Sequence, residues 1–270
     1  MLSSPIDFYW FSGTGNTLLV VRRMEKVLAE NGLKVNLFRI EKSSPMDVNA
    51  SHALGLAFPV AMQSTYPFVW DFIRNLPESE NTKVFMVDTL YMFSGGIVGP
   101  LREVLKNKGY DPAGASEIRM PHNFFHPKND ERKNSRMIEA GLAKAEKYAQ
   151  ELAEGKSGWG RIPVLSDIMY RIGTGDSTWK KAAEKGSKYQ VSAEKCTSCG
   201  LCVTLCPVDN IRMKEIPVFL DKCCLCMRCH SFCPYEAITY PDKEYEPYTA
   251  VKALDLLSEK QQEKGKYSSD

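Results

Sequence analysis

The chain has 270 residues, of which 43% are hydrophobic and 25% are charged, and its formal net charge is +2 at pH 7. This is the composition of an ordinary globular protein, and a net charge so near zero gives no reason to expect nucleic acid as a partner. The longest apolar stretch, Ala53–Met62, is about half the length of a membrane-spanning helix. The first ten residues lack the basic segment of a signal peptide. We therefore expect a cytoplasmic protein with no membrane span.

The first half of the chain, residues 1–155, alternates between strand-like and helix-like segments. In chain order the predicted elements are strand Ile6–Phe11, helix Leu18–Asn31, strand Lys34–Ile40, strand Ala53–Pro59, helix Tyr66–Asn75, strand Val84–Leu90, helix Ile97–Lys108, strand Ser116–Met120 and helix Arg132–Glu154. Five strands that alternate with helices predict an α/β domain, in which a parallel sheet is covered on both faces.

The second half has a different character. Residues 156–189 lose the periodic pattern, but they contain Trp159 and Trp179, so we expect a connector that packs against one or both domains. Within it, Gly173–Asp176 reads as a linker turn because no strand precedes it. Residues 190–245 carry all nine cysteines, and residues 246–270 form a tail with a predicted surface helix from Thr249 to Lys264.

The cysteines form two copies of one pattern. Each copy has three cysteines separated by two residues, then a fourth after three residues, followed by proline; the copies begin at Cys196 and Cys223. This spacing is typical of [4Fe–4S] ligation, and in proteins with two clusters the fourth cysteine of each copy binds the other cluster. The predicted ligand sets are Cys196, Cys199, Cys202 and Cys233 for the first cluster, and Cys223, Cys226, Cys229 and Cys206 for the second.

Structural zinc and disulfides are the alternatives for these cysteines. Zinc sites usually combine two cysteine pairs around a long loop rather than triplets followed by a prolyl cysteine, and clustered cysteines in a cytosolic chain favour metal over disulfides. The segment resembles bacterial two-cluster ferredoxins, a resemblance that implies one-electron transfer in a small α+β domain and places Ile211 and Ile238 beside the clusters. Cys224 lies outside the pattern, either as a small buried residue, as a spare ligand, or as a thiol that tunes the neighbouring cluster.

A second motif follows the first predicted strand. Residues Ser12, Gly13, Thr14, Gly15, Asn16 and Thr17 lead directly into a helix, whose free N-terminal amides and dipole favour an anion. The loop has no lysine of the nucleoside-triphosphate type and lacks the third glycine of a dinucleotide fingerprint. A cradle of hydroxyls and amides without a cation suits the terminal phosphate of FMN, and a plain turn between strand and helix is the alternative.

This loop resembles that of the flavodoxins. The resemblance implies a sheet of order 2-1-3-4-5 with the flavin at the switch point, and a flavin ring between two further loops. The first loop contributes Pro59, Val60, Ala61 and Met62, and the second contributes Thr89, Leu90, Tyr91, Met92, Phe93, Ser94, Gly95 and Gly96. Tyr91 or Phe93 could stack on the ring, with ordinary packing as the alternative for Tyr91. Asn123 and His122 fall at the expected cofactor edge, where an ordinary loop histidine is the preferred interpretation of His122.

Taken together, the two modules resemble the fused flavodoxin–ferredoxin proteins of anaerobic bacteria and archaea. That resemblance implies an electron-transfer protein that passes electrons between FMN and two [4Fe–4S] clusters and onward to a protein partner. No nicotinamide-binding pattern is present. Two alternatives stay open: a flavoenzyme whose clusters feed electrons to a small substrate, and a ferredoxin whose first domain docks without flavin. The sequence also leaves a homodimer open.

Overall fold

The computed structural model describes residues 2–92, 96–124, 130–160, 165–240 and 245–258. The elements of the first half are β1 (Ile6–Trp10), α1 (Asn16–Glu30), β2 (Val35–Arg39), β3 (Ala53–Pro59), α2 (Pro67–Arg74), β4 (Lys83–Leu90), α3 (Val98–Asn107), β5 (Asp111–Arg119) and α4 (Glu131–Ala153). Two short 3-10 helices, Ile40–Lys42 and Pro45–Asp47, follow β2. All five strands are parallel, in the order β2-β1-β3-β4-β5. The predicted fold class and strand order are confirmed.

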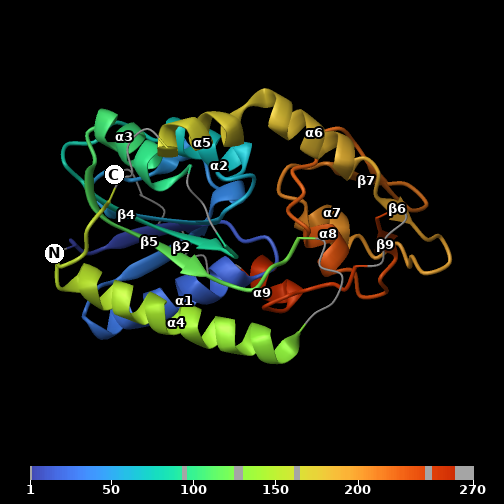
Figure 1. Ribbon diagram of the computed structural model, residues 1–270, viewed down its shortest axis with the longest axis horizontal. Coiled ribbons are helices and arrows are strands. Elements are labelled where there is room, and N and C mark those ends of the chain that lie inside the picture. The colour runs from blue at the N-terminus through green and yellow to red at the C-terminus, as the bar shows by residue number, and fades with distance from the viewer. Residues whose placement is uncertain (1, 93–95, 125–129, 161–164, 241–244, 259–270) are drawn as a thin grey trace, which may run out of the picture.

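The sheet is covered on both faces (Figure 1). Helices α1 and α4 pack on one face and bury a core that includes Phe8, Met24 and Phe85. Helices α2 and α3 cover the other face, where Trp70 of α2 and Leu56 of β3 belong to a second core. The strands β1, β3 and β4 are almost wholly buried, as expected of central parallel strands that are shielded on two sides.

The edge strand β5 begins at Asp111, five residues before the predicted start at Ser116. Its first residues include Pro112, Ala113 and Gly114, which are not typical strand formers. The backbone pairing with β4 nevertheless extends over them, with a register irregularity at Val84/Phe85. Pairing to a buried neighbour therefore overrides the local sequence preference here.

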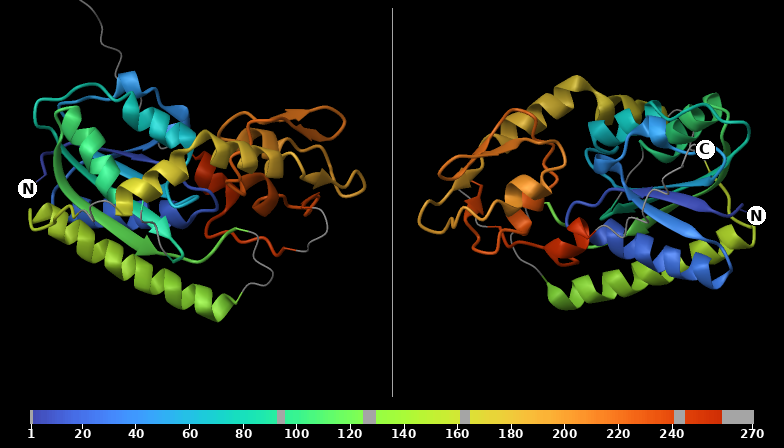
Figure 2. Two further views of the ribbon diagram at one scale, coloured as in Figure 1. Left: turned by 45° about the horizontal axis from the view of Figure 1, so that its top comes forward. Right: turned by 180° about the vertical axis from the view of Figure 1, so that it is seen from behind.

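The connector contains two helices that the sequence pattern did not reveal, α5 (Leu165–Thr174) and α6 (Asp176–Gly186). Helix α5 lies beside α3, and α6 continues from it to the cysteine-rich half (Figures 1 and 2). Gly175 caps the start of α6, so the predicted turn at Gly173–Asp176 is the junction between two helices.

The cysteine-rich half is built from short elements: β6 (Gln190–Val191), α7 (Leu201–Leu205), β7 (Ile211–Met213), β8 (Pro217–Phe219), α8 (Arg228–Ser231) and β9 (Ile238–Thr239). Strands β6 and β9 pair antiparallel, as do β7 and β8. In both copies of the repeat a residue with positive φ, Gly200 or Met227, precedes the short helix.

The two halves share their cores. Leu205 and Phe232 belong to the apolar cluster under α1 and α4, and Cys224 and Cys226 belong to the cluster on the opposite face. The tail then returns to the first half as α9 (Ala253–Leu257), shorter than the helix predicted from Thr249 to Lys264, whose residues from 259 on lie outside the described part. Leu256 of α9 is fully buried. Among the described residues, no helix combines the length and the apolar character needed to span a membrane.

Candidate cofactor sites

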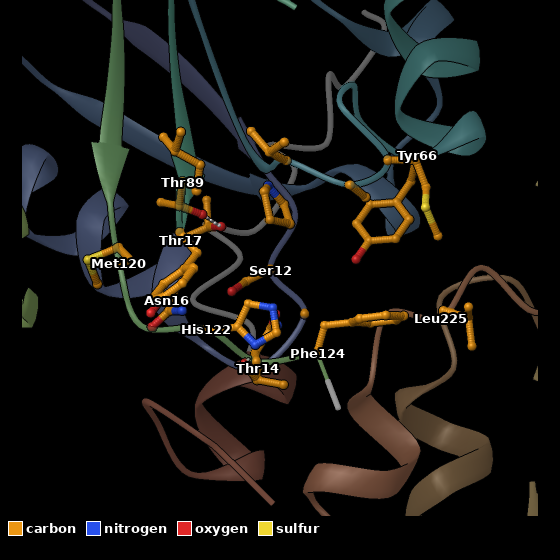
Figure 3. A pocket seen from close by; sticks show the side chains of 18 of the residues that line it. Ser12, Thr14, Asn16, Thr17, Tyr66, Thr89, Met120, His122, Phe124 and Leu225 are labelled. Carbon is orange, nitrogen blue, oxygen red and sulfur yellow. Dashed lines mark hydrogen bonds between the residues drawn. The ribbon is translucent and has the colours of Figure 1, made fainter. Parts of the chain in front are cut away.

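A pocket of about 220 Å³ lies at the carboxyl ends of β1, β3 and β4 (Figure 3). Its described lining contains no lysine or arginine. The lining residues are Ser12, Gly13, Thr14, Asn16, Thr17, Pro59, Val60, Ala61, Met62, Tyr66, Thr89, Leu90, Tyr91, Met120, Pro121, His122, Asn123, Phe124, Trp179, Cys224 and Leu225. The pocket thus gathers most of the loop residues predicted from the sequence, together with three from the second half of the chain, Trp179, Cys224 and Leu225.

The loop between β1 and α1 forms the polar end of this pocket. Ser12, Thr14 and Thr17 are buried hydroxyl residues, and the Ser12 Oγ accepts a hydrogen bond from the Gly15 amide at 3.1 Å. Thr17 Oγ1 is hydrogen-bonded to Thr89 Oγ1 at 2.8 Å. Gly15 is the N-cap of α1 and has no side chain to cap the first turn, so the first amides of the helix can serve an anion. This arrangement fits a phosphate monoester.

Both glycines of the loop are also required by close contacts with later parts of the chain, the cysteine repeat and the tail. A Cβ on Gly13 would lie 2.7 Å from the carbonyl oxygen of Cys226, and one on Gly15 would lie 2.6 Å from Val251. Gly15 has φ = 109°, a conformation that favours glycine. The Ala250 amide donates to the Thr14 carbonyl at 2.8 Å. The loop is therefore enclosed by the cysteine repeat and the tail.

Asn16 and Asn123 are held by hydrogen bonds that fix the rest of the loop. Asn16 Nδ2 donates to the Pro121 carbonyl at 2.8 Å, and its Oδ1 accepts from the Tyr248 hydroxyl at 2.7 Å. Asn123 Nδ2 donates to Thr14 Oγ1 at 3.0 Å. Both asparagines thus position the loop, and Asn123 connects it to the segment after β5.

The opposite end of the pocket is aromatic and apolar. Tyr66, just before α2, and His122 and Phe124, both from the segment after β5, line it (Figure 3). Tyr91 also lines the pocket, with its ring 5.1 Å from that of His122 and its hydroxyl accepting from Lys133 Nζ at 3.0 Å. A flat apolar surface beside a polar cradle fits the two ends of FMN.

Not every residue predicted from the second ring loop lies at the pocket. Met92 is 69% exposed and lines a neighbouring surface groove instead. Gly96 donates its amide to the Gln63 carbonyl at 3.1 Å and packs against α5 at Tyr170. Phe93, Ser94 and Gly95 lie outside the described residues. The structure therefore assigns the near part of this loop, Thr89 to Tyr91, to the pocket.

The cysteines surround two smaller cavities. The first is lined by Cys196, Cys199, Cys202 and Cys233, and the second by Cys206, Cys223, Cys226 and Cys229. These are the two sets predicted from the crossed spacing. Ile238 lines the first cavity and Ile211 the second. Among the described residues, no three Cys, His, Asp or Glu side chains lie close enough together to hold a single metal ion.

Backbone amides point at several of these sulfurs. The Asn210, Ala237 and Leu225 amides donate to the Sγ atoms of Cys206, Cys233 and Cys223, at 3.2, 3.3 and 3.4 Å. Hydrogen bonds to sulfur are one of the features by which proteins tune iron–sulfur clusters. The donor set of four thiols with amide support in each cavity fits a [4Fe–4S] cluster.

The comparisons with known proteins separate the chain into the same two parts. The family described as "4Fe-4S binding domain" matches residues 189–212 and 216–239. The chain therefore joins a flavodoxin-like fold to a 4Fe-4S binding domain. The strand order β2-β1-β3-β4-β5 is the one that defines the flavodoxin-like fold.

Solved structures similar to the flavodoxin-like domain include three from bacteria. The two-electron reduced flavodoxin of Megasphaera elsdenii is 21% identical, with a TM-score of 0.39, and the match covers 52% of this chain and 99% of that one. A flavodoxin of Streptococcus pneumonia TIGR4 is 16% identical, with a TM-score of 0.43 and coverages of 55% and 97%. Rubredoxin oxygen:oxidoreductase of Desulfovibrio gigas is 14% identical, with a TM-score of 0.36 and coverages of 57% and 37%. The comparison with curated proteins gave no match.

Arg228 joins the 4Fe-4S binding domain to the flavodoxin-like domain. It lies between two predicted ligands, Cys226 and Cys229, and only 3% of its side chain is exposed. Its Nη1 is 2.8 Å from Oε1 of Glu41, whose side chain is 1% exposed. Its Nε donates to the Ser12 carbonyl at 2.9 Å, and its guanidinium lies 4.6 Å from the centre of the Phe11 ring.

Cys224 and Leu225 lie where the flavodoxin-like domain meets the second cysteine cavity. Both residues line the pocket beside the loop Ser12–Thr17 and the second cavity. A hydrogen bond with the Cys224 thiol is the main cause that lowers the pKa of Cys226 to about 7, against the opposing effect of burial, and Arg228 adds to the lowering. The same hydrogen bond, followed by burial, raises the pKa of the Cys224 thiol well above its ordinary value.

Sequence reasoning did not identify Arg228, Glu41, Tyr66, Trp179 or Tyr248 as site residues. A signal for Arg228 was present, because the first copy of the repeat carries Leu201 at the equivalent position. A charged residue in place of a leucine, beside a predicted cluster ligand, marks a special environment. Glu41 carries no such signal, since it looks like an ordinary surface acid after β2.

Proposed function

We propose that this protein transfers electrons between an FMN and two [4Fe–4S] clusters and exchanges them with a protein partner. The main support is the wall formed by Cys224 and Leu225, which borders the pocket beside the loop Ser12–Thr17 on one side and the second cysteine cavity on the other. Two redox sites that share a wall one residue thick are adjacent within a single molecule. Electron exchange between them needs no diffusional encounter.

The chain's own residues would hold each group. The hydroxyls and amides of the loop Ser12–Thr17 would bind the phosphate, and Tyr66, Tyr91 and Phe124 would contact the apolar ring. The two crossed sets of cysteines would bind the clusters. A bound flavin supplies two-electron chemistry and each cluster supplies one-electron chemistry, so the combination can divide electron pairs into single steps.

The first cavity is the more accessible end of the proposed route. Cys199 is exposed, and Tyr235, which also lines this cavity, is 52% exposed. In the second set, by contrast, Cys226 is buried and the neighbouring Cys224 is buried as well. We therefore propose that the partner protein exchanges electrons at the first cluster, and that the second cluster connects the first to the flavin.

Anaerobic purification followed by cofactor analysis is the first test. We expect about eight iron atoms, about eight sulfides and about one FMN per chain, on the basis of two four-iron clusters. Colourless oxygen-free protein, or protein containing zinc in place of iron and sulfide, would contradict the proposal.

A kinetic test determines whether electrons reach the flavin through the second cluster. We expect a one-electron donor to reduce the flavin of wild-type protein rapidly in stopped-flow absorbance, and to do so far more slowly in the Cys226→Ala variant. The Thr204→Ala variant is the control, because Thr204 is exposed on the short helix between Cys202 and Cys206 and lines none of the three cavities, so this variant should retain both clusters. Equal flavin reduction rates in wild type and a Cys226→Ala protein that has lost its second cluster would show that electrons reach the flavin by another route.

A further inference from the structure

The connector between the two domains contributes to the pocket. Helix α6 starts at Asp176, more than fifty residues after the last β-strand of the flavodoxin-like domain, yet its Trp179 lines the same pocket as the phosphate loop. Figure 2 shows α5 and α6 running from the sheet domain to the cysteine-rich half in both views. The connector is therefore part of the site and not only a link between domains.

Trp179 is held in place on two sides. Its Nε1 donates to the Gly173 carbonyl at 2.8 Å, a bond across the junction between α5 and α6. Its ring centre lies 5.7 Å from that of Tyr66, at an angle of 48°. Because Tyr66 is itself buried and lines the pocket, this contact fixes the indole at the pocket wall while its side chain stays partly accessible.

The residues near Trp179 belong to the apolar end of the pocket. Tyr66 packs against it, and both Trp179 and Met62 pack against the buried apolar cluster that contains Leu225. The hydroxyl and amide groups suited to a phosphate are on a different segment, Ser12–Thr17. An indole in these surroundings offers a flat aromatic surface and no charge, which is suited to a flavin ring.

We infer that Trp179 is a flavin-binding residue, supplied by the connector, that packs against the isoalloxazine ring. This inference rests on the proposed binding of FMN in the pocket. The other end of α6 reaches the second cysteine cavity, where Gly186 lies directly against Cys223. One short helix thus contacts both proposed cofactor sites, with Trp179 at the pocket and Gly186 at the second cysteine cavity.

The experiment compares two tryptophans of the connector in cluster-loaded protein from which the flavin has been removed. Trp159 is the matched control: it is half-buried like Trp179, its Nε1 also donates to a backbone carbonyl, that of Val98 at 2.8 Å, and it does not line the pocket. Equilibrium dialysis against FMN and against riboflavin gives the dissociation constants for wild type, Trp179→Leu, Trp179→Phe and Trp159→Leu. Iron content is measured on each sample to verify that the clusters are retained.

We expect Trp179→Leu to weaken the binding of FMN and of riboflavin by the same factor, about tenfold, which is the upper end of the effect of one aromatic contact. Trp179→Phe should restore most of the affinity, and Trp159→Leu should leave it unchanged. Riboflavin lacks the phosphate, so an equal loss for both ligands assigns the contact to the ring. The visible circular dichroism of the bound flavin should also change in Trp179→Leu.

Three outcomes of this experiment would contradict the inference, and they can be told apart. Affinity unchanged in Trp179→Leu, or reduced equally in Trp159→Leu, would overturn the assignment of Trp179 while leaving FMN binding intact. A loss for FMN without a loss for riboflavin would overturn the ring contact. Wild-type protein that binds neither ligand would overturn the proposed function and the inference together.

Discussion

Replacing Arg228 with leucine tests whether a buried ion pair joins the two domains. Leucine is the residue that the first copy of the repeat carries at this position, Leu201, so the change makes the two copies alike. In the variant, the Glu41 carboxylate would remain in a place where its side chain is 1% exposed, with no arginine 2.8 Å away. The carbonyls of Ser12 and Leu205 would each lose a donor.

The expected loss is large. Removing one partner of a buried ion pair usually costs about 3 to 5 kcal/mol, because the other charge is left uncompensated. Since 1 kcal/mol lowers the melting temperature of a domain of 150–250 residues by about 2 to 4 °C, we expect a decrease of about 6 to 20 °C. Replacing both residues, as in Arg228→Leu/Glu41→Leu, removes the buried charge altogether. That variant should lose only about 1 to 2 kcal/mol, mainly from the two carbonyls without donors.

The assay is thermal unfolding of anaerobic, cofactor-loaded protein, followed by circular dichroism, with iron content measured beforehand. Arg22→Leu is the control, because its ion pair with Asp255 lies at 3.0 Å on the surface, where the two side chains are 41% and 34% exposed. Exposed pairs of this kind contribute at most about 1 kcal/mol. If the double variant melted no higher than Arg228→Leu, uncompensated charge would not be the cause of the loss, and the reasoning would be refuted.

Three further predictions concern the cysteine crossing, the phosphate loop and a buried acid. Cys206→Ser should alter the cluster bound mainly by the second triplet, and EPR damage confined to the other cluster would contradict the crossed ligation. Gly13→Ala should weaken FMN binding at least tenfold in equilibrium dialysis, because the added methyl would lie 2.7 Å from the Cys226 carbonyl; Gly158→Ala, at a position with no atom within 4 Å, should not. Asp88 is fully buried, and burial, followed by the charge of Glu117, raises its pKa well above the ordinary value. Because the folded-state pKa of Asp88 is raised, the stability contributed by its protonated carboxyl is present at low pH. This stability is lost as pH rises from about 4 towards the folded-state pKa, by up to about 1.4 kcal/mol per pH unit. Asp88→Asn should therefore flatten the fall of the melting temperature as pH rises above about 4, and a pH slope that the substitution leaves unchanged would refute the raised pKa of Asp88.

The sequence by itself determined the elements that depend on local patterns. The apolar runs at Ala53–Pro59 and Val84–Leu90 read as buried strands, and the structure has β3 and β4 there. The spacing of the cysteine repeat was likewise sufficient to sort eight thiols into the two sets that line the two cavities. In both cases the information lies within a few residues along the chain, where strand period and metal-ligand spacing act directly.

The tertiary structure alone decided which distant residues complete the sites. Nothing in the local sequence places Trp179 in the pocket, Glu41 opposite Arg228, or Val251 against Gly15. The helices α5 and α6 were missed for a related reason, since most helical stability in proteins comes from packing and not from the helix's own sequence. These contacts exist because the 4Fe-4S binding domain and the tail pack onto the carboxyl end of the sheet, and the shapes of both surfaces, rather than any spacing along the chain, select the residues that meet there.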